Sequence, residues 1–146
     1  MNETNFPLGN IIIALVSSHR NLTTQRIRKL GLYPGQDMIL MQLLQRDRQS
    51  QNELVQSLCV DHSTIAKSVN RLMKNDLVVT VKSEIDKRVT LVSLTSKGKD
   101  IAQQAQDVWD DVEKIATGDM SSEEVTSFLK LSEEMVRNFN NAMDKK

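Results

Sequence analysis

Apolar residues recur at helical spacing along most of the chain and predict six helices. The second helix is expected to begin at Pro34, which suits a first helical turn. The third opens on a capping-box pattern, Ser50 and Glu53, and the fourth on Asp61 as its N-cap. The predicted apolar faces of these four helices are Leu8, Ile11, Ile12, Leu15, His19 and Leu22; Met38, Ile39, Leu43 and Leu44; Leu54, Val55 and Leu58; and Ile65, Val69, Leu72 and Met73.

Two longer helices are expected at the C-terminal end. Thr95 can cap the first of them, which should end near Gly118, and a second capping box, Ser121 and Glu124, opens the last. The last helix carries more apolar surface than one small chain can bury, so we expect a partner to cover it. The predicted apolar stripe of the first of these helices is Ile101, Ala105, Val108, Val112 and Ile115. That of the last helix is Val125, Phe128, Leu129, Ser132, Met135, Val136, Phe139 and Met143.

One segment breaks the helical pattern. Residues 78–98, "VVTVKSEIDKRVTLVSLTSKG", hold two β-branched runs around a charged knot and predict a single β-hairpin. An isolated hairpin is marginal in water, so part of it must lie on the helical body. The residues expected to include this contact are Val79, Val81, Val89 and Leu91.

The third and fourth helices are short and joined by a tight turn, which is the arrangement of a helix-turn-helix. On the fourth, hydroxyl and cationic side chains share one face. Cations there can pair with phosphates or guanine edges, and short hydroxyl side chains can approach bases closely. Because any solvated helix face looks similar, this pattern alone leaves both interpretations open. The candidate residues are Ser63, Thr64, Lys67, Ser68 and Arg71.

The hairpin tip, Asp86-Lys87-Arg88, favours the nucleic-acid interpretation. Asp86 and Arg88 are two residues apart, so they can share a side of the strand and form an ion pair. Such a pair would hold the guanidinium extended, and arginine suits the negative potential of a narrow minor groove. The alternative is an exposed salt bridge contributing about 0–1 kcal/mol.

The net charge of zero conceals a gradient along the 146 residues. Residues 1–60 carry six Lys or Arg and four Asp or Glu, residues 61–99 carry eight and four, and residues 100–146 carry five and eleven. A basic middle beside an acidic C-terminal third is expected if only the middle faces phosphates, although the acidic part also reads as a solvated helix face. No run approaches the roughly 18 apolar residues of a membrane span, so a cytoplasmic protein is expected.

Together these segments resemble the MarR (multiple antibiotic resistance regulator) family of winged helix-turn-helix transcription factors. The resemblance rests on "LGLYPGQDMILMQLL", "ELVQSL", "STIAKSVNRL", and "DKR" followed by "VTLVSLTSKG". It implies a mainly α fold with a β-hairpin wing, in one domain spanning 1–146. Residues 30–100 would form the DNA-binding head, and helices within 6–29 and 96–143 the dimerisation base.

The resemblance also implies a function. A homodimer would straddle a dyad-symmetric operator on double-stranded DNA, with residues 63–74 in the major groove and Arg88, oriented by Asp86, in the minor groove. Family members are most often repressors, and many respond to small aromatic acids or oxidants. The sequence departs from the family at Tyr33, where a capping Thr is common, at Asp76, where Gly is usual, and at Val81, which is often cationic. Asn75 or Asp76 must then take any left-handed cap.

Three further residues are candidates for other functions. Cys59 is expected to be a small buried hydrophobe, with an oxidant-sensing thiol as the alternative. His19 is expected in the core or an interface, and His62 near a phosphate or in solvent. These residues form no metal-binding pattern, and no nucleophile or phosphate-loop motif is present, so we expect no cofactor and no enzyme. A winged-helix protein-interaction module without DNA binding remains a further alternative, and the effector-binding residues are unknown.

Overall fold

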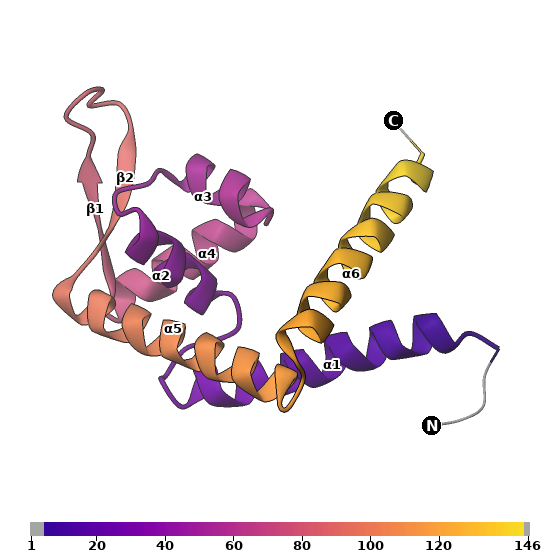
Figure 1. Cartoon of the computed structure of the whole chain (residues 1–146). Coiled ribbons are helices and arrows are strands. Elements are labelled where there is room, and N and C mark those ends of the chain that lie inside the picture. The colour runs from indigo at the N-terminus through magenta and orange to yellow at the C-terminus, as the bar shows by residue number, and fades with distance from the viewer. Residues whose placement is uncertain (1–4, 145–146) are drawn as a thin grey trace. The chain divides into compact units, whose positions relative to one another are not determined.

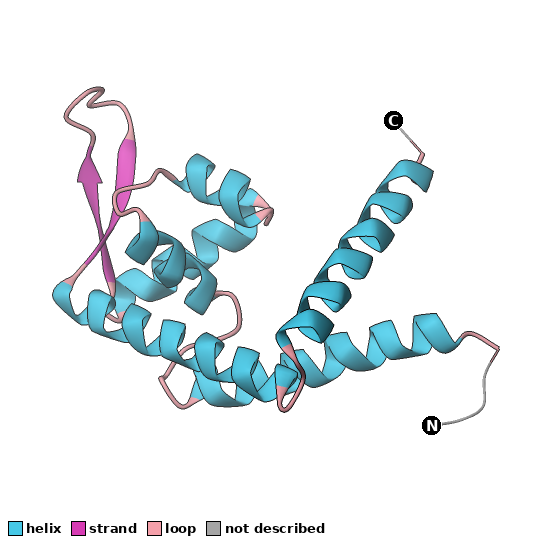
Figure 2. Cartoon of the chain, viewed as in Figure 1, coloured by secondary structure: helices cyan, strands magenta, loops and turns pink. Residues whose placement is uncertain are grey.

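Six helices and one antiparallel hairpin follow one another in the order that the sequence predicts (Figures 1 and 2). The computed structural model describes residues 5–144, which form two compact units divided between Val112 and Glu113. No helix of this described part is long and apolar enough to cross a membrane. The elements are α1 (Pro7–Arg28), α2 (Gln36–Gln45), α3 (Gln51–Leu58), α4 (His62–Lys74), β1 (Val78–Lys82), β2 (Thr90–Leu94), α5 (Ser96–Thr117) and α6 (Ser122–Ala142).

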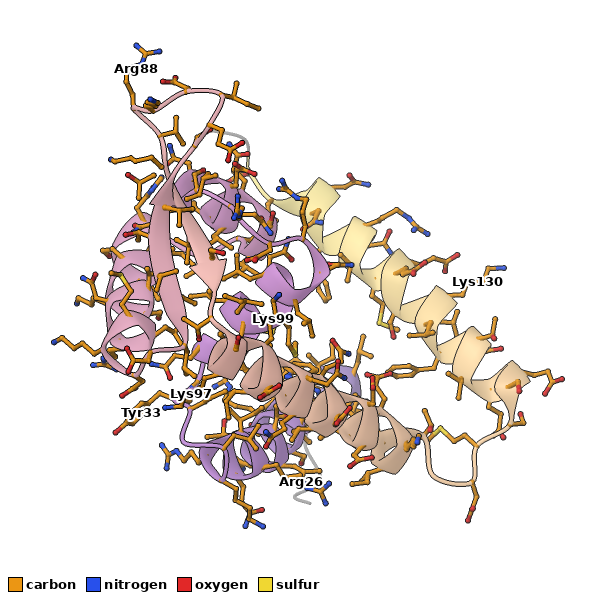
Figure 3. All side chains as sticks on the ribbon, turned by 90° about the vertical axis from the view of Figure 1, so that its left-hand side faces the viewer. Arg26, Tyr33, Arg88, Lys97, Lys99 and Lys130 are labelled. Atoms are coloured by element: carbon orange, nitrogen blue, oxygen red, sulfur yellow. The ribbon has the colours of Figure 1, made fainter. Side chains whose placement is uncertain are left out.

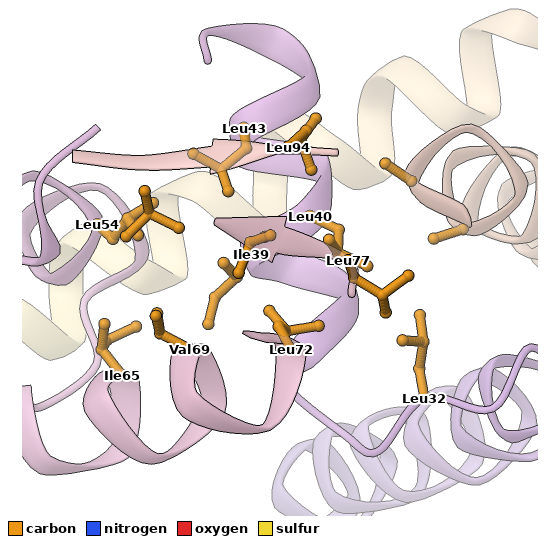
Figure 4. Packing of buried hydrophobic residues seen from close by; sticks show 14 of the residues in the cluster. Leu32, Ile39, Leu40, Leu43, Leu54, Ile65, Val69, Leu72, Leu77 and Leu94 are labelled. Carbon is orange, nitrogen blue, oxygen red and sulfur yellow. The ribbon is translucent and has the colours of Figure 1, made fainter. Parts of the chain in front are cut away.

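The first unit is built around an aliphatic core (Figure 4). Leucine, isoleucine and valine side chains from α2, α3, α4 and the hairpin fill its centre. Ile27 of α1 and Ala102 and Ala105 of α5 close its edge, and the small alanines let α5 approach closely. Burying each large aliphatic side chain stabilises the unit by about 1.5–3 kcal/mol. The members buried to 2% exposure or less include Ile27, Ile39, Leu40, Leu43, Leu54, Ile65, Val69, Leu72, Val78 and Val92.

The helix starts follow the predicted caps except at α2. Ser50 and Ser121 both form complete capping boxes, and the Asp61 carboxylate accepts the backbone N–H of Thr64 at 2.7 Å. The predicted start of α2 at Pro34 is wrong. The helix begins after Gly35, whose φ of 94° makes it a left-handed N-cap that proline geometry cannot supply.

The hairpin contributes Val78, Val92 and Leu94 to the core, and these three residues share one of its faces. Val78 pairs with Leu94 in register, and both are buried, whereas Val79 and Val89 are exposed. The expectation that the set Val79, Val81, Val89 and Leu91 includes residues on the body agrees with Val81 and Leu91, which are half-buried, and not with the two exposed valines. The set lies on the hairpin face opposite to Val78, Val92 and Leu94, so the alternation of a strand holds but the more deeply buried face is the other one.

The segment between α2 and α3 braces the second strand. Gln49 is fully buried and forms an antiparallel bridge with Val92, extending the hairpin's hydrogen bonding by one residue. Beside it, the Asp47 carboxylate accepts hydrogen bonds from the Ser93 hydroxyl at 3.1 Å and from the Leu94 backbone N–H at 3.0 Å. The inner end of β2 is thus tied to the helical body on the side away from β1.

The end of α4 and the start of α5 meet below the hairpin. Asp76, with φ of 58°, supplies the left-handed residue that ends α4, as one of the two predicted candidates. The Thr95 hydroxyl donates to the Asp76 carbonyl and accepts from the Gly98 N–H, so Thr95 caps α5 as predicted. Gly98 is buried here, and a Cβ at this position would lie 1.8 Å from the carbonyl oxygen of Leu77.

The second unit contains the end of α5 and all of α6. Gly118, with φ of 51°, ends α5 where the sequence predicts. No residue of α6 is buried, and its apolar stripe is open to solvent. The large apolar side chains of this helix that are more than half exposed are Phe128, Leu129, Leu131, Val136 and Phe139.

Replacing Gly98 by alanine tests the contact between α5 and the strand. The new methyl group has no room against a backbone carbonyl, so we expect a loss of at least about 2 kcal/mol in the free energy of unfolding. Gly9 is the matched control, because the nearest atom to its added Cβ is 3.9 Å away, so alanine there should be neutral or stabilising by up to about 1 kcal/mol. Urea unfolding followed by circular dichroism at one protein concentration measures both, and equal stability of the two variants would contradict the close contact.

Candidate nucleic-acid interface

The exposed face of α4 presents the predicted polar and cationic side chains. Ser63, Thr64, Lys67 and Arg71 are exposed, and Ser68 is half-buried. The helix is amphipathic, because Ile65, Val69 and Leu72 on its opposite face are buried in the core. The chain therefore brings the sequence-predicted set together on one surface.

The first turn of this face is organised by Asp61. Its Oδ1 accepts the Thr64 N–H at 2.7 Å and the Ser63 hydroxyl at 2.8 Å. The backbone hydrogen bond from Thr64, and then that from the Ser63 hydroxyl, hold the pKa of the Asp61 carboxyl below its usual range. Ser63 thus donates within the cap and keeps its lone pairs available to an outside donor.

Arg71 lies over an aromatic ring. Its guanidinium carbon is 5.6 Å from the centre of the Tyr33 ring, within the range of a cation–π contact. The sequence singled out Tyr33 only as a missing cap. Nothing in the local pattern relates residues 33 and 71, so the contact is visible only in the folded chain.

The hairpin tip holds the predicted ion pair. Arg88 donates from Nε to Asp86 Oδ1 and from a terminal nitrogen to Oδ2, both at 3.0 Å, which is a bidentate geometry. The Arg88 backbone N–H also donates to Oδ1, at 3.1 Å. The side-chain hydrogen bond from Arg88 lowers the pKa of Asp86, and Asp86 in turn raises that of Arg88.

Arg88 remains open to a ligand despite this pair. Its side chain is 90% exposed, and Figure 3 shows it at the outer end of the hairpin. The loop behind it is closed by hydrogen bonds from the Val89 N–H to the Asp86 carbonyl and from the Asp86 N–H to the Ser83 hydroxyl. Lys87 and Ile85 are exposed beside it, so Ile85 does not pack against the head.

The structure also places the cysteine and the two histidines singled out in the sequence. Cys59 is exposed, so the expected buried role is wrong; it is the left-handed C-cap of α3, with φ of 54°, and this conformation turns the side chain outward. The His19 ring packs against Trp109 of α5, 5.3 Å between centroids, but His19 is exposed, so the expected core position is wrong and the expected interface position stays a prediction. His62 is exposed. In residues 5–144 no group of three His, Cys, Asp or Glu side chains could hold a metal ion.

The fold agrees with comparisons to known proteins. The sequence profile described as transcriptional regulator SarA/Rot matches residues 21–105. The chain belongs to this family of regulators. This SarA/Rot member is 33% identical over 97 residues to the transcriptional regulator AdcR of Streptococcus pyogenes, a match spanning 66% of this chain and 65% of that protein.

Two solved structures show the same fold. A mutant MarR from E. coli complexed with operator DNA superposes with a TM-score of 0.78 at 23% identity, covering 91% of this chain and 99% of that one. The DNA binding of BpsR of Bordetella bronchiseptica is regulated by 6-hydroxynicotinic acid. BpsR superposes with a TM-score of 0.74 at 20% identity, and the match covers 88% of this chain and 98% of BpsR. The expected MarR-type winged helix-turn-helix fold of this SarA/Rot member is confirmed.

The tip geometry predicts a titration result. The pKa of the Asp86 carboxyl should lie below its ordinary range, because the Arg88 hydrogen bonds favour the charged form. Arg88→Ala should raise the pKa of Asp86 toward its ordinary range, and the matched control Lys87→Ala should leave it in place. Carbon-detected NMR titration of the side-chain carboxyls reads this directly, and an unchanged Asp86 pKa in Arg88→Ala would rule out the pair in solution.

Proposed function

We propose that this protein is a transcription regulator that binds double-stranded DNA as a homodimer, and that it is not an enzyme. The proposal depends on two features of the same head. One is the exposed cationic face of α4, and the other is the exposed Arg88 on the hairpin, which Asp86 holds through two side-chain hydrogen bonds. In this proposal α4 lies in the major groove and Arg88 reaches the adjacent minor groove. As a regulator of bacterial genes, the protein would act in the cytoplasm.

The DNA-contacting residues in this proposal are those of one head, within residues 30–100. Lys67 and Arg71 meet phosphates or guanine edges, while Lys87 adds charge beside the wing tip. Asp86 orients Arg88 and does not itself contact DNA. The hydroxyl-bearing members of the recognition surface are Ser63, Thr64 and Ser68.

The proposed homodimer uses the terminal helices within 6–29 and 96–143. Its support is the apolar surface that α1 and α6 each expose, which a single chain leaves in water. A two-fold dimer would place two heads on a dyad-symmetric site, with half-sites about one DNA turn apart. The exposed apolar residues that support this role include Leu8, Ile11, Leu15, Phe128, Leu131 and Phe139.

We further propose that a small aromatic acid or a similar molecule controls binding, and that the protein acts as a repressor. The support is the fold shared with BpsR, because the compound that regulates the DNA binding of BpsR, 6-hydroxynicotinic acid, is of this chemical class. A ligand that prefers one spacing of the two heads would shift the dimer toward or away from the form that fits successive major grooves.

Arg88→Ala should weaken binding to the operator roughly tenfold while leaving dimerisation intact. Selection of bound fragments from genomic DNA of the source organism supplies the operator. Fluorescence anisotropy then gives the affinity, and sedimentation gives the oligomeric state. Unchanged affinity at moderate salt would remove the wing from the interface, and a protein that selects no fragment at all would be the interaction module without DNA binding.

Lys67→Ala should change how binding depends on salt. If Lys67 neutralises one phosphate in each head, the slope of log affinity against log salt should fall in magnitude by about 2 for the dimer. Lys130→Ala on α6 removes the same charge outside the proposed head and should leave the slope unchanged. Equal slopes for Lys67→Ala and the unmodified protein would show that this lysine faces solvent in the complex.

A further inference from the structure

Tyr33 supports the guanidinium of Arg71 from the loop that precedes α2. The 5.6 Å between the guanidinium carbon and the ring centre is a distance at which the ring's negative face attracts a cation. The ring lies outside α4, so it constrains the arginine from a neighbouring element. Arg71 therefore meets solvent with one side of its guanidinium already occupied.

The backbone of Tyr33 is itself held in a closed turn. Its N–H donates to the Gln36 side-chain oxygen at 3.0 Å, and its carbonyl accepts the Gln36 N–H at 3.1 Å. Gln36 is 2% exposed, so the partner of these bonds is anchored in the protein interior. The ring is consequently presented by a fixed turn, although more than half of Tyr33 is exposed.

A buried carboxylate ties that turn to α5. Asp37 Oδ1 accepts the Gly35 N–H at 3.1 Å, and its Oδ2 accepts the Trp109 indole N–H at 2.9 Å. Asp37 is 4% exposed, and a buried carboxylate with both oxygens engaged resists displacement. The backbone turn that carries the Tyr33 ring is thus tied to the core.

An aromatic support differs from a carboxylate in what it does to charge. The salt bridges among residues 5–144 are Arg46–Glu53 and Arg88–Asp86, so Arg71 keeps its full positive charge. A neutral ring restricts the rotamers of the arginine without cancelling its attraction for a phosphate. Ordering the side chain before binding reduces the entropy lost when it meets its partner.

We propose that Tyr33 is a positioning residue for DNA binding, which holds Arg71 across the surface of α4 in the orientation that DNA requires. This inference rests on the proposed function, since it assigns a role to Tyr33 only if Arg71 meets DNA. Tyr33 acts through Arg71, so its effect must disappear when Arg71 is absent. That dependence separates positioning from a direct contact or a structural role.

A double-mutant cycle on the full-length protein tests the inference. Tyr33→Leu should weaken operator binding by about two- to fivefold per head, while Tyr33→Phe, which keeps the ring, should bind nearly as well as the unmodified protein. In an Arg71→Ala background, Tyr33→Leu should cause no further loss. In an Arg88→Ala background, Tyr33→Leu should weaken operator binding by the same factor as it does in the unmodified protein. The two effects should be independent because Figure 3 places Arg88 and Tyr33 at opposite ends of the head.

Each result of the cycle decides one question. A full loss from Tyr33→Leu in the Arg71→Ala background would overturn the positioning role, as would an equal loss from Tyr33→Phe. If Arg71→Ala and Arg88→Ala both bind the operator normally, the proposed interface on α4 and the hairpin is wrong, and if the unmodified protein selects no operator at all, the proposed function fails, whatever Tyr33 does. Thermal unfolding checks that the variants fold, and Tyr33→Ser repeats the cycle with a second ringless side chain, so that a defect particular to leucine does not decide the outcome.

Discussion

The head depends on the contact between the end of α4 and the start of α5. Three consecutive carbonyls at the end of α4 are used there: Asn75 accepts from the Lys97 ammonium, Asp76 from the Thr95 hydroxyl, and Leu77 from the Thr95 N–H. Carbonyls at a helix end lack partners within the helix, so these bonds satisfy groups that the chain would otherwise leave open. Close approach is possible because Gly98 has no side chain.

This contact fixes where the hairpin begins and ends, and hence where its tip lies. β1 leaves the junction and β2 returns to it, so the two strands must be antiparallel and in a single register, Val78 opposite Leu94. Asp47 then holds the inner end of β2 through Ser93 and Leu94. A hairpin clamped at one end projects its other end away from the body, which is why the tip carries the charged residues and the base carries the buried ones.

Local chemistry was predictable from the sequence, whereas contacts between distant segments were not. The capping boxes at Ser50 and Ser121 and the Asp86–Arg88 pair involve residues two or three apart, so their spacing is visible in the sequence. By contrast, the Trp109–Asp37 and Tyr33–Arg71 contacts join different elements, and no periodicity relates their members.

The wrong predictions at Pro34 and Cys59 have a common physical cause. Both residues were assigned the role typical of their residue type. Their actual roles follow from backbone conformation: Gly35 at φ 94° displaces the helix start, and Cys59 at φ 54° turns outward at a helix end. Val79 is exposed because it lies on the hairpin face opposite to Val78, Val92 and Leu94, and Val89 is exposed just before β2. Left-handed residues other than glycine are uncommon, so composition gives little warning of them.

The two arginines of the proposed interface are oriented by opposite means. Arg88 lies at the end of a hairpin where the body offers no support, and the Asp86 carboxylate two residues away holds it and offsets its positive charge. Arg71 lies against the body, where a ring on a fixed turn can hold it and leave the charge intact. The proposed interface thus combines an arginine on α4 that has no carboxylate partner within residues 5–144 with a carboxylate-held arginine beside Lys87 at the hairpin tip. Such a division would let a chain of zero net charge favour one DNA geometry, because the cations are concentrated on the proposed recognition surface while the fixed orientation of Arg88 favours a fit to the groove.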